Sequence, residues 1–304
     1  MTLDDYRRFY ADEVRLAANL RSQSLADAFA AVPREAFLGP PPWQICSADQ
    51  ASLALMGLSG IYITTTEPRD LYHNVLVAID ASRYLNNGHP STLARWIDAL
   101  DLQRGNRVYH VGCGVGYYTA ILAEAVGPHG AVVAIDVDAD LATRAKQNLA
   151  AYSHVTVSAG DGAEFDPGVC DAMLINAGVT HPHLAWIKRL ATGGRVVLPL
   201  THSMAANANC GNGVMVKIVR TPDGFVAEVI THAAIFSCTS VRDPELESQL
   251  QMRLQNRQLR KLKSVRLDSH EKVDTCLVHG RDICLSAAEP MPVVARDFET
   301  NPQA

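Results

Sequence analysis

The residues most able to do chemistry follow a predicted strand, Arg107–Val111. Gly112, Gly114 and Gly116 alternate directly after it, and a helical pattern follows them. Glycines let the backbone turn tightly and approach a ligand closely, and the following helix directs its N-terminus at the site. A dinucleotide-binding fingerprint needs glycine at the position of Tyr117, so the segment predicts a cofactor turn of the G-x-G-x-G type instead.

Three later strand ends carry polar residues. Asp136 ends the next strand, twenty residues after Gly116, where a carboxylate can accept both ribose hydroxyls of an adenosine. A helix cap or loop carboxylate is its alternative role, and Asp138, beyond the strand end, is the competing candidate. Asp161 follows the third strand and Asn176 ends the fourth. Ligands bind at this carboxyl edge in open α/β sheets, so the strand ends together predict a cofactor site.

Strands and helices alternate through the middle of the chain, which predicts a parallel sheet covered on both faces. Ser91 is the expected cap of the first helix, and Gly193-Gly194 the expected stop of the last. The predicted helices are Ser91–Leu100, Thr119–Val126, Ala139–Ala151 and Pro182–Leu190; the predicted strands are Arg107–Val111, Ala131–Asp136, Val155–Ser158, Cys170–Asn176 and Arg195–Leu200.

The flanking regions differ from this middle part. Residues 1–80 combine apolar residues at helical spacing with β character at 61–66 and 74–79, and form a predicted helical lid region. Residues 81–240 form the predicted cofactor-binding domain, which closes with a hairpin around the turn Thr221–Gly224. Residues 241–304 form a predicted helical extension, starting at Asp243 or Pro244, and a loose tail from Pro290.

Composition bounds the class of protein. The chain has 304 residues, 48% hydrophobic, with a net charge of −5, which excludes wholesale disorder and argues against a general nucleic-acid or anionic-membrane binder. The segment 253–266 is locally basic; a solvated helix face is the simpler interpretation, and a nucleic-acid or acidic-partner patch is the alternative. No secretory signal pattern opens the sequence, and 50–66 is too short and polar to span a bilayer. We therefore expect a soluble, cytoplasmic protein.

Seven scattered cysteines lack the CxxC spacing of zinc knuckles and redox motifs. Without a signal sequence, they indicate reduced thiols of a cytoplasmic protein. His181 and His183 lie two residues apart, but no third ligand is apparent beside them. The sequence therefore predicts no metal site.

The glycine turn resembles motif I of class I S-adenosylmethionine-dependent methyltransferases, and residues 31–238 are similar to the protein L-isoaspartyl O-methyltransferase family. The similarity rests on five motifs: Val32–Phe37, Gly112–Ala123, Gly160–Gly162, Cys170–Ala172 and Leu190–Pro199. The predicted hairpin also fits that family. The resemblance implies an α/β, Rossmann-like sheet, mostly parallel with a C-terminal antiparallel hairpin.

The resemblance also implies that the cofactor is S-adenosyl-L-methionine. An acidic residue at Asp161, followed by a small one, would lie against the adenine, near its exocyclic amine. His110 departs from the usual acidic residue at its position, and we expect a repacked loop contact there that alters cofactor affinity. The candidate cofactor-binding residues are His110, Gly112, Cys113, Gly114, Gly116, Tyr117, Asp136, Val137, Asp161, Gly162 and Asn176.

A second departure concerns the acceptor. The family carries a loop reading roughly Gly-Gln-Thr-Ile-Ser-x-Pro, whose hydroxyls help to hold the isoaspartyl substrate. Aligned on Pro90, this chain has Asn86 at the threonine position and Gly88 at the serine position. A site that loses such hydrogen-bonding groups can lose orders of magnitude in discrimination. The candidate catalytic residues are His89 and Asn87; the candidate substrate residues are Tyr84, Asn86, Gly88 and His181.

The leading functional hypothesis is O-methylation of a carboxylate on a peptide or protein. Such an acceptor is ionised at neutral pH and needs no base. Methylation of a small metabolite or a natural-product peptide is one alternative, and a non-catalytic cofactor- or peptide-binding module of the same fold is another. A nucleic-acid methyltransferase is disfavoured, because Asn176-Ala-Gly-Val replaces the Asn/Asp-Pro-Pro-Tyr/Phe signature of base-amine methylation.

Overall fold

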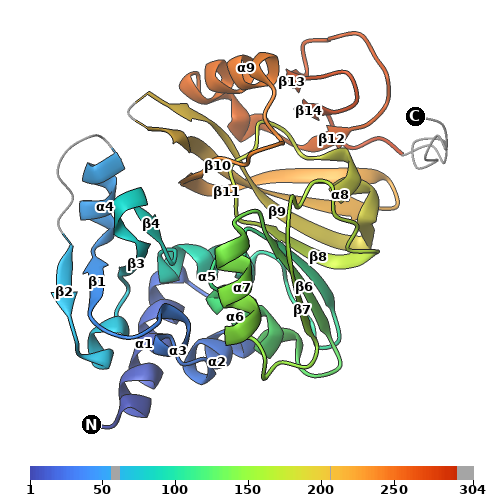
Figure 1. Ribbon diagram of the computed structural model, residues 1–304. Coiled ribbons are helices and arrows are strands. Elements are labelled where there is room, and N and C mark those ends of the chain that lie inside the picture. The colour runs from blue at the N-terminus through green and yellow to red at the C-terminus, as the bar shows by residue number, and fades with distance from the viewer. Residues whose placement is uncertain (56–61, 206, 293–304) are drawn as a thin grey trace. The chain divides into compact units, whose positions relative to one another are not determined.

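The computed structural model describes residues 1–55, 62–205 and 207–292 (Figure 1). The chain divides into two compact units, Met1–Gly162 and Ala163–Ala304. This boundary falls inside the predicted domain 81–240, and the three-region division and the lid role of residues 1–80 stay predictions. None of the helices in the described ranges is both long and apolar enough to cross a membrane.

Helices open the first unit. α1 (Leu3–Ala18) packs against α2 (Gln23–Ala31) and α5 (Pro90–Asp98), and α2 packs against α6 (Tyr117–Val126). α5 begins one residue earlier than predicted, and Ser91 is not its cap. Proline suits the first helical position because its φ is already fixed and its missing N–H is not needed there. α6 likewise begins at its tyrosine pair, two residues before the predicted start.

Arg34 joins the N-terminal segments to one another. Its side chain is fully buried, and its guanidinium donates to the carbonyls of Leu71, His73 and Val75 at 2.8, 3.3 and 2.8 Å. The guanidinium also lies 5.8 Å from the ring centroid of Tyr10, within the range of a cation–π contact. The motif 32–37 therefore organises the packing of this region.

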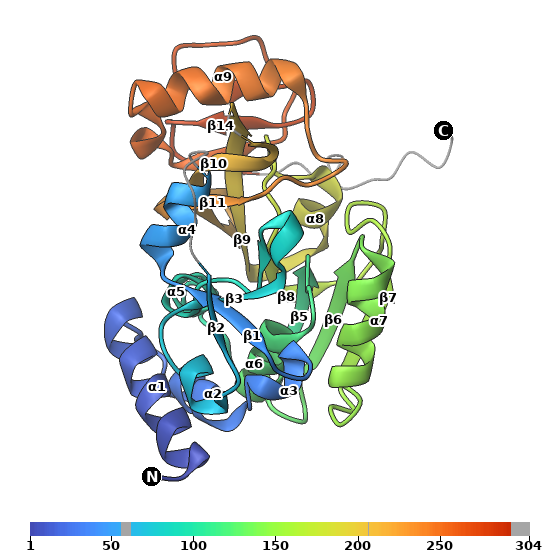
Figure 2. The ribbon, with the colours of Figure 1, turned by 60° about the vertical axis from the view of Figure 1, so that its left-hand side comes forward.

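A small antiparallel sheet follows these helices, in the order β2-β1-β3-β4 (Figure 2). Leu38, Trp43, Leu71 and Val77 form its buried core. The predicted β character is found at β2 and β3, although Ile61 lies outside the described residues. The elements are α3 (Glu35–Leu38), β1 (Trp43–Cys46), α4 (Ala48–Leu55), β2 (Ile63–Thr65), η1 (Pro68–Leu71), β3 (Leu76–Asp80), η2 (Ala81–Arg83) and β4 (Leu85–Asn86).

The first unit also contains the predicted parallel strands. β5 (Arg107–Val111), β6 (Ala131–Asp136) and β7 (Val155–Ala159) are parallel neighbours in that order. α7 (Ala139–Asn148) packs against β6 and β7 (Figure 2). These strands follow the predicted ranges within one residue, since long apolar runs between turn residues mark a buried parallel strand clearly.

In the second unit the strands follow the order β13-β14-β12-β11-β10-β9-β8. β8 and β9 are parallel, and every other neighbouring pair is antiparallel. The predicted hairpin is confirmed as β10 and β11, but the antiparallel part extends well beyond it. The bounds are β8 (Cys170–Ile175), β9 (Leu190–Met204), β10 (Asn207–Thr221), β11 (Gly224–Phe236), β12 (Ser264–Arg266), β13 (Cys276–His279) and β14 (Cys284–Ser286).

Two sequence predictions in this unit are wrong. Gly193-Gly194 does not end a helix: α8 (Leu184–Arg189) stops earlier, and the glycines lie in an irregular stretch of β9, where Gly193 has a φ of +79°. The C-terminal extension is not only helical. After α9 (Pro244–Gln255), capped by Asp243, come η3 (Gln258–Lys261) and the strands β12 to β14, which are too short to show a period-2 pattern.

Candidate functional site

The glycine turn connects β5 to α6 in the predicted strand–turn–helix arrangement. Gly112, Gly114 and Gly116 have φ values of +74°, +56° and +92°, a region that residues with a side chain rarely adopt. A Cβ on Gly116 would lie 2.8 Å from Leu149 Cδ1, so this glycine also lets the turn pack against the chain that follows α7. The turn thus presents backbone N–H groups at the N-terminus of α6.

Asp136 anchors this turn from the end of β6. Its Oδ2 accepts from the Gly114 N–H at 2.7 Å and its Oδ1 from the Asp138 N–H at 3.0 Å. Burial raises the pKa of the Asp136 carboxyl, and the two backbone donors oppose that shift. Each carboxylate oxygen keeps a lone pair for a further donor.

Asp138 has a different role. Its Oδ1 accepts from the N–H groups of Asp140 and Leu141 and so caps α7, while its Oδ2 pairs with Arg83 at 2.9 Å. The Arg83 hydrogen bond holds the pKa of the Asp138 carboxyl below its usual range. Of the two competing carboxylates, this geometry favours Asp136 as the ligand-binding one.

The end of β7 approaches the same turn. A Cβ on Gly162 would lie 2.6 Å from Val111 Cγ1, so only glycine fits there, and the Gly162 carbonyl accepts from Tyr109 Oη at 2.9 Å. Asp161 is partly exposed beside it. Val137 is 57% exposed directly after Asp136, an apolar surface next to the carboxylate.

Three candidate cofactor residues have buried side chains. His110 lies within β5, as the predicted strand Arg107–Val111 requires, and its Nδ1 is 2.9 Å from Thr119 Oγ1 in α6; the expected effect on cofactor affinity stays a prediction. Burial lowers its pKa to about 3, so the ring is neutral. Burial likewise raises the pKa of the Cys113 thiol far above its usual range, which makes it unreactive. The whole Tyr117 residue is buried at the start of α6, with its Oη 3.3 Å from Tyr10 Oη, so its side chain is directed into the packing of the first unit.

The predicted acceptor loop connects β4 to α5. Tyr84 is exposed in a left-handed conformation, with a φ of +54°. Asn86 Oδ1 accepts from Tyr62 Oη at 2.8 Å, and Asn86 Nδ2 donates to the Tyr84 carbonyl at 3.0 Å. The amide that replaces the expected threonine hydroxyl is therefore already used to shape the loop.

Asn87 differs from Asn86 in this respect. Its side chain is only 6% exposed, and its Nδ2 is buried without a hydrogen-bond partner in the described parts of the chain. Its backbone N–H is fixed by the Val77 carbonyl at 2.8 Å. A buried amide donor without a partner is costly, so it marks a position where a ligand oxygen would bind.

His89 lies at the N-cap of α5. Its Nδ1 is 3.2 Å from Thr92 Oγ1 and 3.3 Å from Ser91 Oγ; Ser91 was expected only as a helix cap, and Thr92 was not predicted. Burial lowers the pKa of His89, so its ring is neutral at neutral pH. The loop therefore does have a hydroxyl pair, located after Pro90 rather than before it.

Three contacts place this loop and the residues just before it, Ile79 and Arg83, beside the glycine turn and the start of α7. Tyr118 Oη, in α6, donates to the Gly88 carbonyl at 3.1 Å, and Gly88 has a φ of +73°. Arg83 reaches Asp138 at the end of β6. A Cβ on Gly114 would meet only Ile79 Cδ1, at 3.9 Å. Arg83 and Tyr118 were not predicted as site residues: Arg83 belongs to no motif, and the motif that contains Tyr118 does not show what its side chain contacts.

Two further candidates belong to the second unit. Asn176 directly follows β8 and is partly buried. His181 Nδ1 lies 2.9 Å from Thr180 Oγ1, and burial lowers the His181 pKa. Their predicted roles in cofactor and substrate binding stay predictions.

Comparisons with known proteins agree with the glycine turn and the fold. Residues 59–230 match the family model of the protein-L-isoaspartate(D-aspartate) O-methyltransferases. The protein-L-isoaspartate O-methyltransferase of Ignicoccus hospitalis is 36% identical over 149 residues, which cover 48% of this chain and 68% of that protein. Protein-L-isoaspartate O-methyltransferase 1 of Archaeoglobus fulgidus is 30% identical over 204 residues, 66% of this chain and 82% of that protein.

Solved structures share the fold. A protein-L-isoaspartate O-methyltransferase with 20% sequence identity superposes with a TM-score of 0.59 over 86% of this chain and 72% of its own. A Plasmodium falciparum candidate member of the same family, solved with S-adenosyl-L-homocysteine, has 13% identity and a TM-score of 0.56 over 77% of this chain and 98% of its own.

Proposed function

The chain belongs to the protein-L-isoaspartate(D-aspartate) O-methyltransferase family, and we propose that it methylates the free carboxylate of isoaspartyl residues in peptides and proteins. It is a class I, S-adenosylmethionine-dependent methyltransferase with a Rossmann-like fold. The acceptor loop has Asn86 and Gly88 where the family has hydroxyl residues, so other groups of this loop have to bind the acceptor.

The first unit fits an adenosyl cofactor. A Cβ on Gly114 would meet the end of the Ile79 side chain at an ordinary van der Waals distance, and both Asp136 carboxylate oxygens keep a lone pair for a ribose hydroxyl. We infer that Gly112, Gly114, Gly116 and Asp136 hold the nucleoside, with Val137 and Asp161 beside the adenine. When bound, S-adenosylmethionine supplies a methyl group activated by its sulfonium.

The acceptor carboxylate has to be oriented toward the methyl group, but no residue has to remove a proton from it. A carboxylate is ionised at neutral pH, so the protein has only to place it in line and exclude water. The unpartnered Asn87 Nδ2 is the observation that carries the proposal, because a carboxylate oxygen is the kind of acceptor that satisfies it. Neutral His89, bonded through Nδ1 to the Ser91 and Thr92 hydroxyls, is assigned a positioning role at the start of α5.

The direct test supplies purified protein with methyl-labelled cofactor and either an isoaspartyl peptide or its aspartyl twin. We expect base-labile label on the isoaspartyl peptide alone. Label on neither peptide, together with turnover of another acceptor, would reject the isoaspartyl substrate.

Variants at Asn87 test the binding mode. We expect Asn87→Ala to lower kcat/KM for the isoaspartyl peptide by roughly 10- to 100-fold, the loss of one hydrogen bond to a charged group. Asn87→Asp should lower it further, because an isosteric carboxylate repels the acceptor. Affinity for S-adenosylhomocysteine serves as the control and should stay at the wild-type value in both variants. Equal kcat/KM in all three proteins would exclude Asn87 from acceptor binding.

A further inference from the structure

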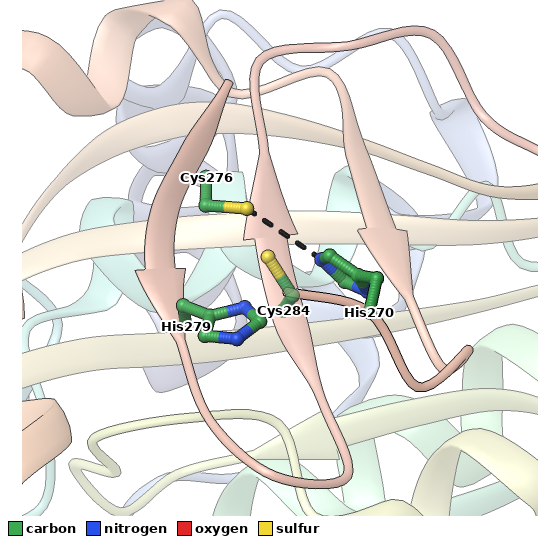
Figure 3. Close-up of side chains that lie close together, drawn as sticks. All are labelled: His270, Cys276, His279 and Cys284. Atoms are coloured by element: carbon green, nitrogen blue, oxygen red, sulfur yellow. Dashed lines mark hydrogen bonds between the residues drawn. The ribbon is translucent and has the colours of Figure 1, made fainter. Parts of the chain in front are cut away.

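The second unit contains a cluster of two cysteines and two histidines. His270, Cys276, His279 and Cys284 each offer one possible ligand atom, and these atoms all lie within 4.8 Å of one another. Figure 3 shows the side chains of all four residues directed toward one another over the short strands. The cluster lies outside residues 59–230, the segment matched by the family model.

The strand pairing explains how the cluster forms. His279 and Cys284 are directly opposite each other across β13 and β14, and Cys276 is opposite Ser286. Residues three apart in a regular strand point to opposite faces. The register shifts between Cys276 and Val278, and such an irregularity returns Cys276 to the face that carries His279 and Cys284.

His270 is oriented as a ligand would be. Its Nδ1 lies 2.8 Å from the Asp268 carbonyl, which can only accept, so Nδ1 carries the proton and Nε2 keeps its lone pair. Nε2 lies 3.5 Å from Cys276 Sγ. The Asp268 carboxylate is 3.3 Å from Nδ1 and is itself held by Arg266. Metal-binding histidines characteristically donate their second ring N–H to such oxygens.

The remaining donors are also placed to bind a metal. Both cysteines are buried free thiols, and His279 Nδ1 is buried without a hydrogen-bond partner in the described part of the chain. The His270 and His279 ring centroids are 4.8 Å apart. Nitrogen and sulfur donors from β13, β14 and the segment before them therefore converge here, and both sulfur donors come from buried residues.

We propose that His270, Cys276, His279 and Cys284 bind one Zn²⁺ as a structural site. Two sulfur and two nitrogen donors are a typical tetrahedral zinc set, and four protein ligands leave no open position for catalysis. On binding, the two thiols lose their protons, and the two thiolates balance the charge of the ion. The ion joins β13, β14 and the segment before them, strands that are too short to be stable alone.

The main test measures metal content. Full-length protein, purified without a metal-affinity step and loaded with zinc, should retain one Zn²⁺ per chain after dialysis. Cobalt substitution should give the d–d absorption of tetrahedral Co²⁺ together with thiolate-to-cobalt charge transfer. This measurement uses the wild-type protein, so it does not depend on whether a variant folds. Absence of bound metal, or a Cys276–Cys284 disulfide in freshly purified protein, would overturn the proposal.

Variants test the assignment of the ligands. Cys284→Ser and His270→Asn should lose the metal, whereas His270→Cys should retain it, since thiolate can replace imidazole. The matched control is Cys238→Ser, which changes a free cysteine outside the cluster and should keep one Zn²⁺ per chain. Asp268→Ala should weaken zinc affinity by about 10- to 100-fold through loss of the outer hydrogen bond. Unchanged zinc content in Cys284→Ser would contradict the site.

Discussion

Asp136, the last residue of β6, and Asp138, the N-cap of α7, differ in what their carboxylates bind. Asp136 and Asp138 are two residues apart, and the sequence favoured Asp136 because Asp138 lies beyond the predicted strand end. In the structure, Asp138 caps α7 and pairs with Arg83, whereas Asp136 receives one backbone N–H on each oxygen beside the glycine turn. The capping and ion-pair role of Asp138 depends on where α7 begins and on the Arg83 side chain, which the spacing of the two aspartates does not show.

Matched amide variants test this division of roles. Asp136→Asn should weaken S-adenosylhomocysteine binding roughly 10- to 100-fold, because the charged acceptor for the ribose is lost. Asp138→Asn should bind with near wild-type affinity, since asparagine also caps helices and the exposed pair with Arg83 contributes less than about 1 kcal/mol. Isothermal calorimetry gives both constants. The reverse order of effects would assign the ribose to Asp138.

A second residue-scale prediction concerns His110. Its folded pKa of about 3 lies below the ordinary histidine value of 6.5, so the unfolded chain binds more protons. Its contribution to stability is therefore complete above about pH 6.5 and is lost as the pH falls toward 3.

The measurement is denaturant unfolding between pH 6.5 and 4.5 for the wild type and His110→Gln. The stability difference between the two proteins should change by up to about 1.4 kcal/mol per pH unit, with the wild type losing more on acidification. Parallel pH profiles would show that His110 is not the group responsible.

At the scale of elements, the sequence predicted best where the patterns are long. β5, β6 and β7 and the hairpin β10–β11 follow their predicted positions, because apolar runs and the Pro222-Asp223 turn are strong local signals. The short strands β1, β4 and β12 to β14 were not predicted, since strands of two to four residues cannot show a period. The β9 irregularity at Gly193 was misread for a related reason: glycine ends a helix or bends a strand with equal ease.

The N-terminal elements depend on one buried side chain. Arg34→Met keeps the length but removes the hydrogen bonds to three carbonyls, so we expect a loss of about 2–4 kcal/mol in unfolding free energy. Arg8→Met is the control, because Arg8 is exposed and pairs only with Asp5 three residues away; its effect should stay within about 0.5 kcal/mol. Thermal or denaturant unfolding measures both, and equal midpoints would contradict the role of Arg34.

At the scale of the whole molecule, family membership accounts for the fold and the cofactor, and two further features lie in the acceptor loop and the C-terminal extension. The acceptor loop has Asn86 and Gly88 in place of the expected hydroxyls, and it buries Asn87 Nδ2, which has no hydrogen-bond partner among the described residues. The C-terminal extension brings four metal-binding side chains together. The sequence concealed this cluster, because a CxxC search ignores histidines and the shared face depends on a register shift in β13.

The most direct test of the central claim uses one peptide that contains both an aspartyl and an isoaspartyl residue. After incubation with the protein and S-adenosylmethionine, fragmentation mass spectrometry locates the added methyl group. We expect a single methyl ester on the isoaspartyl residue. This ester should be absent when the Asn87→Asp variant replaces the wild-type protein. A methyl group on the aspartyl residue, or on a nitrogen, would contradict it.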